Sequence, residues 1–178
     1  GVLFVREGTP IAPLLHGGHQ ERILRPGTEN LPGIVGLAAA LQLAAEELGD
    51  EAQRLGRLRD RLEAGLRERI QGVQFNGHPE RRVSSISNVS FAGVDGEALL
   101  MALDLKGIAV STGSACTAGS TDPSHVLLAM GVEPALAQGS LRFSLGRDNT
   151  EQDVDYLIEC LVEVVEQLRQ IAPTKVAP

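Results

Sequence analysis

The sequence is poor in cysteines, aromatic residues and lysines, and the first two shortages each exclude a class of protein. It has two cysteines in 178 residues, which excludes a disulfide scaffold and the four-cysteine set of a zinc ribbon. It has no Trp and a formal net charge of −7. Nucleic-acid binding needs a basic face and often stacking aromatics, so we expect no nucleic-acid partner. No apolar run approaches the roughly 20 residues of a membrane span, so we expect no membrane partner and a cytoplasmic protein.

Lysine is the scarcest charged residue. Of 16 basic side chains only Lys106 and Lys175 are lysines, and the other 14 are arginines. This shortage limits the chemistry that the chain can complete alone.

Strand-like and helix-like segments alternate along the chain, which predicts an α/β or α+β body. Residues 1–6, apolar from Val2 to Val5, predict a strand already under way, so we expect the chain to be a piece of a longer protein. Residues 7–30 form a long loop rich in Gly, Pro and His, which is typical of functional loops. Residues 31–48 predict an Ala- and Leu-rich helix that Gly49 and Asp50 end or bend.

The rest of the chain predicts a small sheet backed by two long helices. The first of these helices has apolar residues at three- and four-residue spacing, namely Leu55, Leu58, Leu62, Leu66 and Ile70. Its other faces carry arginines interlaced with acidic residues, which favours a solvated face over an anion-binding one. Strands are expected at 73–75, 85–91, 108–112 and 140–145, the last three in one sheet, and helices at 96–106, 123–130 and after Thr150, which forms a capping box with Asp153.

Cys116 is the strongest candidate for chemistry. It lies among Gly, Ser, Thr and Ala residues at 111–120, whereas a structural cysteine usually lies in an apolar run. It is either a reactive thiol or a loop cysteine without a role. A phosphatase-type loop would need Arg six residues later, where Asp122 stands, and no Cys-x-x-Cys pair is present. Cys160, beside the apolar stripe of the last helix, is interpreted as core.

Two histidines, His16 and His19, flank a pair of glycines. They have the spacing of zinc ligands, but a third ligand at a sensible spacing is missing, so we expect no metal. The two glycines indicate instead a close approach of the backbone to another group.

Two arginines are candidates for binding anions. Arg25 is followed by the backbone N–H of Gly27 and the hydroxyl of Thr28, a combination that suits phosphate, although Thr28 or Asn30 could equally be an ordinary helix N-cap. Arg142 lies inside a strand among apolar neighbours. It either clamps a carboxylate or lies in solvent on an edge strand.

Four motifs, in the same order, resemble segments of the cysteine desulfurases. They are HGGHQERILRPGT at 16–28, NVSF with GE at 88–91 and 96–97, STGSACT at 111–117, and LRFSLGR at 141–147. The long loop around the cysteine is similar to that of the NifS/IscS-like class. The resemblance covers nearly the whole chain.

The resemblance implies a pyridoxal-phosphate (PLP) enzyme of the class-V aminotransferase family, with the PLP-dependent transferase fold type I. Such enzymes are usually homodimers. They convert L-cysteine to L-alanine and pass the sulfur to an acceptor or iron–sulfur scaffold protein, chiefly for iron–sulfur cluster assembly. The expected partners are therefore a second copy of the chain, L-cysteine and a sulfur-acceptor protein.

The resemblance also implies roles for individual residues. Cys116 corresponds to the nucleophile that becomes a persulfide, and Arg142 to the arginine that binds the substrate carboxylate. Thr28 corresponds to a residue that reaches the cofactor phosphate of the other subunit, and His16 and Arg25 lie in the same loop. Pro26 departs from the Ser that is commoner in the family.

By resemblance the chain divides unequally between two domains of the family's fold. Residues 1–30 would be the end of the large cofactor-binding domain, 31–48 a connecting helix, 49–171 a small C-terminal α/β domain, and 172–178 a tail.

The family's Schiff-base lysine lies upstream of the first strand, and neither lysine of this chain matches its position. We therefore expect no desulfurase activity from these 178 residues alone. Two alternatives are a non-catalytic dimerisation or sulfur-relay module and a selenocysteine lyase.

Overall fold

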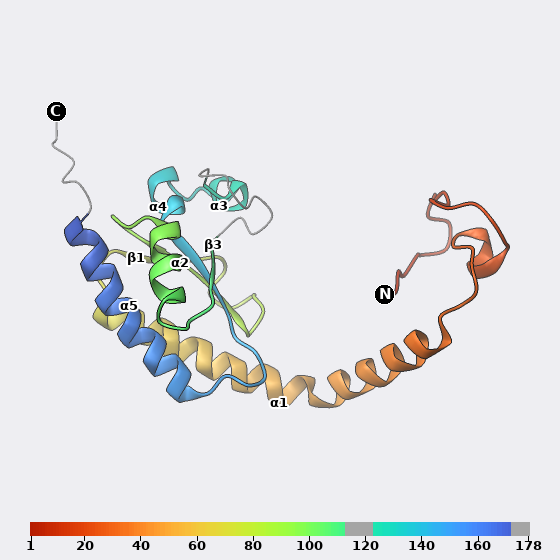
Figure 1. Cartoon of the computed structure of the whole chain (residues 1–178), viewed down its shortest axis with the longest axis horizontal. Helices are drawn as coiled ribbons and strands as arrows, with labels where there is room; N and C mark the ends of the chain where they lie inside the picture. Colours follow the sequence, from red (N-terminus) through yellow and green to blue (C-terminus); the bar gives the residue numbers. More distant parts are fainter. Residues whose placement is uncertain (113–122, 172–178) are drawn as a thin grey trace. The chain divides into compact units, whose positions relative to one another are not determined.

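The computed structural model describes residues 1–112 and 123–171, in two compact units that are treated separately (Figure 1). Gly1–Gly49 is the first unit and Asp50–Pro178 the second. Helix α1 (Leu31–Arg69) runs through the boundary as one helix of 39 residues. Of the two expectations for Gly49 and Asp50, an end or a bend of the helix, the end is therefore wrong. A glycine inside a helix costs only about 1 kcal/mol relative to alanine, which a long helix tolerates.

The first unit contains a loop, the short helix η1 (Gln20–Ile23) and the first part of α1. The strand expected at residues 1–6 is absent from this described segment, and Val2, Leu3 and Phe4 are exposed. A strand forms only when a neighbouring strand pairs with its backbone N–H and C=O groups. Since residues 1–30 contain no such neighbour, the apolar pattern alone does not make a strand.

Helix α1 also corrects the expectation about apolar runs. By length and composition alone it could cross a membrane, because it contains an 18-residue window with a mean hydropathy of 1.3. The expectation underestimated this segment because it counted uninterrupted apolar residues, whereas Ala- and Gly-rich helices reach this hydropathy with a few polar residues included. A helix that packs on a protein core can have the same composition.

The second unit is built on a four-stranded antiparallel sheet of order β1-β2-β4-β3. The strands are β1 (Val73–Asn76), β2 (Ile86–Phe91), β3 (Ser111–Thr112) and β4 (Ser140–Ser144). The expected sheet is confirmed, with β1 added at its edge. Strand β3 is shorter than expected, because Gly107 adopts a φ of +77° and Ile108 N donates to Leu103 O at 3.0 Å, which ends the preceding helix.

Four further helices complete the second unit, and they are α2 (Gly96–Asp104), α3 (His125–Ala129), α4 (Pro134–Gln138) and α5 (Glu151–Ile171). Helix α4 was not predicted. Five residues are too few to show a helical period, and α3, of the same length, was predicted from the flanking Pro123 and Gly131. The expected capping box is confirmed at α5, where Asp153 N donates to Thr150 Oγ1 at 3.2 Å and Thr150 N donates to Asp153 Oδ2 at 2.8 Å.

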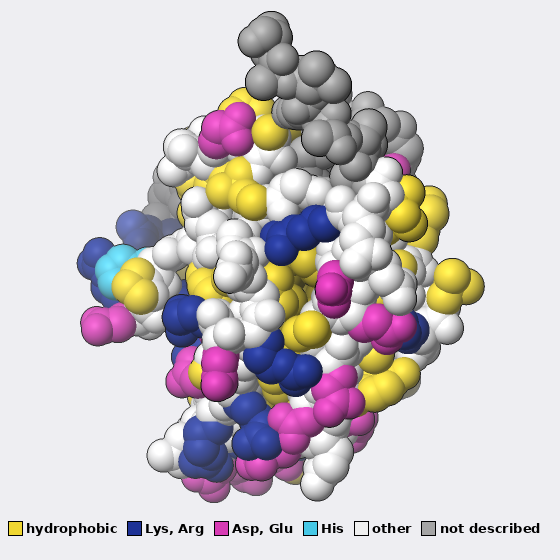
Figure 2. All heavy atoms as spheres, turned by 90° about the vertical axis from the view of Figure 1, so that its left-hand side faces the viewer, with side chains coloured by type: hydrophobic (Ala, Val, Ile, Leu, Met, Phe, Trp, Pro, Cys, Tyr) yellow, Lys and Arg dark blue, Asp and Glu magenta, His cyan; other side chains and the backbone are white. Residues whose placement is uncertain are grey.

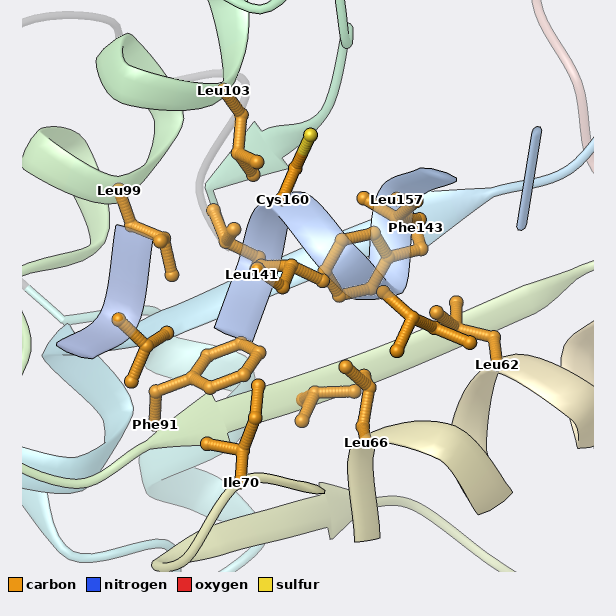
Figure 3. Close-up of a cluster of buried hydrophobic side chains, with 14 of the residues drawn as sticks. Leu62, Leu66, Ile70, Phe91, Leu99, Leu103, Leu141, Phe143, Leu157 and Cys160 are labelled. Carbon is orange, nitrogen blue, oxygen red and sulfur yellow. The ribbon is translucent and has the colours of Figure 1, made fainter. Parts of the chain in front are cut away.

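The core lies between one face of the sheet and the helices α1, α2 and α5. Figure 3 shows leucines of α1 and α2 meeting Phe91 of β2, Phe143 of β4 and Cys160 of α5. The apolar stripe expected on α1 is buried along its length, and Cys160 is buried as interpreted. Burial of this face fixes which side of the sheet remains available for polar residues.

Three of the arginines of α1 in this unit, Arg54, Arg59 and Arg61, pair with acidic residues, as the solvated-face interpretation predicts. Arg61 binds Asp155 of α5 at 2.7 Å, and Arg59 binds Asp60 at 2.6 Å. Figure 2 shows basic and acidic side chains interspersed on one face of the molecule. Such exposed pairs contribute little individually.

One ion pair of the second unit is buried. Glu63 of α1, 7% exposed, accepts two hydrogen bonds from Arg82, at 2.6 and 2.9 Å, and one from Ser87 of β2 at 2.7 Å. Burial raises the pKa of the Glu63 carboxyl, but the hydrogen bonds from Arg82 and Ser87 outweigh it, so the pKa lies below its usual value. The carboxylate thereby ties α1 to β2 and to the loop before it.

Replacing Arg82 with methionine should destabilise the chain by about 3 kcal/mol at pH 7, because it leaves the buried Glu63 carboxylate without its cation. Since the folded pKa is lowered, the stabilisation is fully present above the unfolded pKa of about 4.3 and is lost as pH falls through the folded pKa. Urea denaturation of both proteins at several pH values should show the difference shrinking in acid. Arg61→Met, at an exposed pair, is the control, and an equal loss in both variants would contradict the prediction.

Candidate functional site

The face of the sheet opposite the core carries a row of polar residues across all four strands. Antiparallel pairing places Asn76 opposite Asn88, Asn88 opposite Arg142, and Arg142 opposite Ser111. Directly paired residues project from the same face. On the other face the neighbouring row, with Val89 opposite Leu141, lies in the core. We call the four residues Asn76, Asn88, Arg142 and Ser111 the polar row.

Arg142 is the charged member of the polar row, and β4 is an inner strand, between β2 and β3. The alternative of an exposed edge-strand arginine is therefore wrong. Its side chain is partly buried, and its Nε atom is buried without a hydrogen-bond partner among the described residues. A buried donor without an acceptor is costly. The planar guanidinium fork matches a carboxylate, so the site fits a carboxylate ligand.

The loop that follows β4 is held by an arginine of α1. Arg54 donates to three carbonyl oxygens of this loop, those of Asn149 at 2.7 Å, Arg147 at 2.8 Å and Gly146 at 3.1 Å. Glu51 accepts from the Arg54 Nε atom at 2.8 Å, and its hydrogen bond raises the pKa of Arg54. This clamp fixes the end of the strand that carries Arg142. The sequence did not indicate this role, because Arg54 stands among several other arginines of the same helix.

The strand β3 connects Arg142 with the segment that contains Cys116. Ser111 of β3 is paired with Arg142, and Thr112 is the last residue before the undescribed residues 113–122. Cys116 lies in that segment and so outside the described residues. Its predicted role is untested by the structure, but only three residues separate it from β3.

The candidate cofactor residues His16, Arg25 and Thr28 lie in the loop of the first unit and are all exposed. Asn30 Oδ1 accepts a hydrogen bond from Gly33 N at 3.1 Å, so Asn30 is the N-cap of α1. This settles one alternative, because Thr28 is not the cap. The Thr28 hydroxyl makes no hydrogen bond with the described residues and is available to a ligand.

The backbone of this loop is unusual in a way that the sequence did not indicate. Glu21, Arg22 and Ile23 have φ values of 47°, 56° and 71°, which is strained for residues with a side chain. Gly27 has a φ of +103°, which only glycine adopts easily, and its N–H donates to Gln20 Oε1 at 3.2 Å. Arg25 donates to Pro26 O at 3.1 Å. The loop is thus folded on itself around residues 20–27.

The lysines do not supply a free amine among the described residues. Lys106 lies just after α2 and binds Glu163 of α5 at 2.8 Å, and this hydrogen bond raises the pKa of Lys106. Lys175 lies outside the described residues. No group of three His, Cys, Asp or Glu residues that could hold a metal occurs in the described ranges, and the structure adds no further ligand near His16 and His19.

The solved structures most useful for comparison share this fold. One named "NIFS-LIKE PROTEIN" is 41% identical with a TM-score of 0.78, over 93% of this chain and 42% of that one. A NifS-like protein from Rickettsia africae is 30% identical with a TM-score of 0.75, over 88% of this chain and 41% of that one. The chain therefore has the fold of part of a NifS-like protein.

The family Aminotransferase class-V matches residues 1–157, and the chain belongs to that family. Among curated relatives, "Cysteine desulfurase IscS" of Methanosarcina thermophila is 51% identical over 97% of this chain and 43% of that protein. "Cysteine desulfurase" of Gluconacetobacter diazotrophicus is 47% identical over the same shares. The chain thus spans less than half the length of these relatives.

Replacing Arg54 with lysine should loosen the loop at residues 146–149, because one ammonium group cannot reach three carbonyl oxygens and Glu51 together. We expect amide hydrogen exchange there to become roughly tenfold faster, since the loop then opens more often. The β2 amides should not change. Arg57→Lys, at an exposed position on the same helix, is the control. Equal protection of the loop in wild type and Arg54→Lys would show that the clamp is dispensable.

Proposed function

We propose that the complete polypeptide containing this chain is a PLP-dependent cysteine desulfurase. The observation that carries the proposal is the position of Arg142. Its guanidinium has a buried nitrogen without a hydrogen-bond partner among the described residues, and it lies beside strand β3, which precedes the segment with Cys116. A carboxylate site thus lies beside the strand that precedes the segment with Cys116 in the sequence, and a cysteine substrate has a carboxylate and a sulfur that match these two groups. The names of the relatives agree with this proposal.

The loop of the first unit fits the phosphate of PLP. Arg25 supplies a guanidinium and Thr28 an uncommitted hydroxyl, both exposed, with His16 in the same loop. We assign these three residues to the phosphate, with Thr28 reaching the cofactor of a second subunit in a homodimer. PLP, when bound, supplies an electron sink for the bond that breaks in the substrate.

Two residues of the chain would act on opposite ends of the substrate, one on its carboxylate and one on its sulfur. Arg142 binds the carboxylate through its guanidinium fork and so orients L-cysteine. The Cys116 thiolate attacks the substrate sulfur, forming an S–S bond as the C–S bond breaks. The electron pair of the C–S bond stays with carbon, which takes up a proton. The products are L-alanine and a persulfide on Cys116, so L-cysteine and one thiol are fully accounted for.

The persulfide sulfur then passes to an acceptor thiol, and an iron–sulfur scaffold or other sulfur-acceptor protein is the proposed partner. The membrane alternative raised by α1 is less favoured, because the family match at residues 1–157 includes the whole of this helix. A homologous protein uses the same segment as part of its fold.

In the complete protein, Cys116→Ala should lower sulfide release from L-cysteine by about 10³-fold or more, because the attacking thiolate is lost. The absorbance band of the bound cofactor should remain. Cys160→Ala is the matched control, since Cys160 is buried in the core. Wild-type turnover in Cys116→Ala would remove this residue from its proposed role.

The 178-residue chain alone, mixed with PLP, should form no alanine from L-cysteine. Lys106 is paired with Glu163 and no other lysine occurs among the described residues, so the described part of the chain offers no free lysine amine to hold the cofactor. Amino-acid analysis after prolonged incubation measures this directly. Alanine formation by the fragment would contradict the proposal that the cofactor-binding lysine lies outside these 178 residues. Sulfur accepted by the fragment from a persulfide donor would support the sulfur-relay alternative.

A further inference from the structure

We propose that Asn88 is a second hydrogen-bond donor to the substrate carboxylate, next to Arg142, and thereby a determinant of substrate specificity. This inference rests on the proposed function, because it identifies how the same site recognises its substrate. It is argued from the register of the sheet, from the orientation of one side-chain amide, and from the distribution of donors and acceptors in the polar row.

The register places Asn88 and Arg142 directly opposite each other on β2 and β4. Directly opposed side chains have Cβ atoms about 5 Å apart and project from the same face. A ligand held by the Arg142 guanidinium on this face therefore lies within reach of the Asn88 side chain. Both residues are partly buried.

The orientation of the Asn88 amide follows from its neighbours on β1. Gln74 Nε2 donates to Asn76 Oδ1 at 3.1 Å, so the other branch of the Asn76 amide is the donor. Asn76 Nδ2 in turn donates to Asn88 Oδ1 at 2.7 Å and to Ser90 Oγ at 2.8 Å. The Asn88 oxygen is thereby directed to β1, and its NH₂ group occupies the opposite branch of the planar amide.

The polar row then brings two donors together without an acceptor. Arg142 has only donors, and its buried Nε atom has no acceptor among the described residues. The Asn88 side chain accepts from Asn76 through its oxygen, which leaves its NH₂ group as a donor. On the other side of Arg142, the Ser111 hydroxyl donates to its neighbour Thr112 O at 3.0 Å. Partial burial of two adjacent donor groups costs free energy, and an acceptor with several lone pairs between them offsets this cost. A carboxylate is such an acceptor, with Arg142 supplying the charge and Asn88 one further N–H.

The consequence is selectivity for a free carboxylate. A neutral amide in place of the carboxylate keeps one oxygen but has an NH₂ group in place of the other, which leaves one of the two donors unpaired and loses affinity. Changing Asn88 to Asp keeps the oxygen that Asn76 binds and replaces only the NH₂ branch with a second oxygen. The substitution therefore removes the proposed donor and adds a charge that repels the ligand, at little cost to the network with β1.

The test uses the complete protein with its cofactor and compares Asn88→Asp with Ser144→Asp. Ser144 lies two residues after Arg142, on the same strand and face, and is exposed, so it receives the same new charge without the proposed contact. We expect Asn88→Asp to raise the KM for L-cysteine by about 10- to 100-fold with kcat changed less than about threefold, as for lost uniform binding. Ser144→Asp should change KM by less than about threefold.

Calorimetric titration gives a readout that does not depend on turnover. The Kd for L-alanine should weaken by about tenfold or more in Asn88→Asp, while the Kd for L-alaninamide, which lacks the carboxylate, should not weaken. Asn88→Ala, which adds no charge, should weaken L-alanine binding in the same direction and decides the matter if Asn88→Asp does not fold.

Two results would overturn the inference, namely a wild-type KM and Kd in both Asn88 variants, or equal losses in Asn88→Asp and Ser144→Asp. Failure of the proposed function is distinguishable from these results. A complete protein that binds L-alanine through Asn88 but forms no alanine from L-cysteine would remove the desulfurase activity and leave the carboxylate site in place.

Discussion

The pairing of β2 with β4 is the constraint on which the rest of the second unit depends. The register places Val89 opposite Leu141 in the core and Asn88 opposite Arg142 on the other face. A slip of one residue in either strand would exchange the two faces, putting a guanidinium among leucines. The apolar contacts of the core, shown in Figure 3, fix this register and thereby also fix the position of Arg142 on the opposite face.

Two arginines extend this constraint to α1. Arg54 satisfies three carbonyl oxygens of the loop that follows β4, and Arg82 pairs with the buried Glu63, which also binds β2 through Ser87. Strands β2 and β4 are thus each tied to the same helix near one end. Since an arginine has five donors in a fixed plane, one side chain can fix several backbone atoms at once, which a lysine cannot do. This gives part of the arginine-rich composition a structural use.

Sequence patterns predicted the elements in which apolar residues recur over many turns. They failed where an element forms only by pairing with another segment. The stripe from Leu55 to Ile70 and the capping box at Thr150 follow from local rules and are confirmed. The strand expected at residues 1–6 failed because strands need neighbours, and α4 was missed because five residues show no period.

The candidate site was predictable as a list of residues but not as an arrangement. Motif resemblance selected Arg142, whereas the polar row depends on register across four strands, which no local pattern encodes. The strained backbone at Glu21, Arg22 and Ile23 likewise has no sequence signature, since none of the three is a residue that favours positive φ. The roles of Cys116, His16, Arg25 and Thr28 stay predictions.

The arrangement explains how one small sheet could serve both ends of a small amino acid. Strand β3 is only two residues long, yet it pairs Ser111 with Arg142 and leads directly into the segment with Cys116. Arg142, on an inner strand, is fixed by neighbours on both sides. For the proposed function, the sheet places the arginine in its interior and the residue before the cysteine segment, Thr112, on its edge strand.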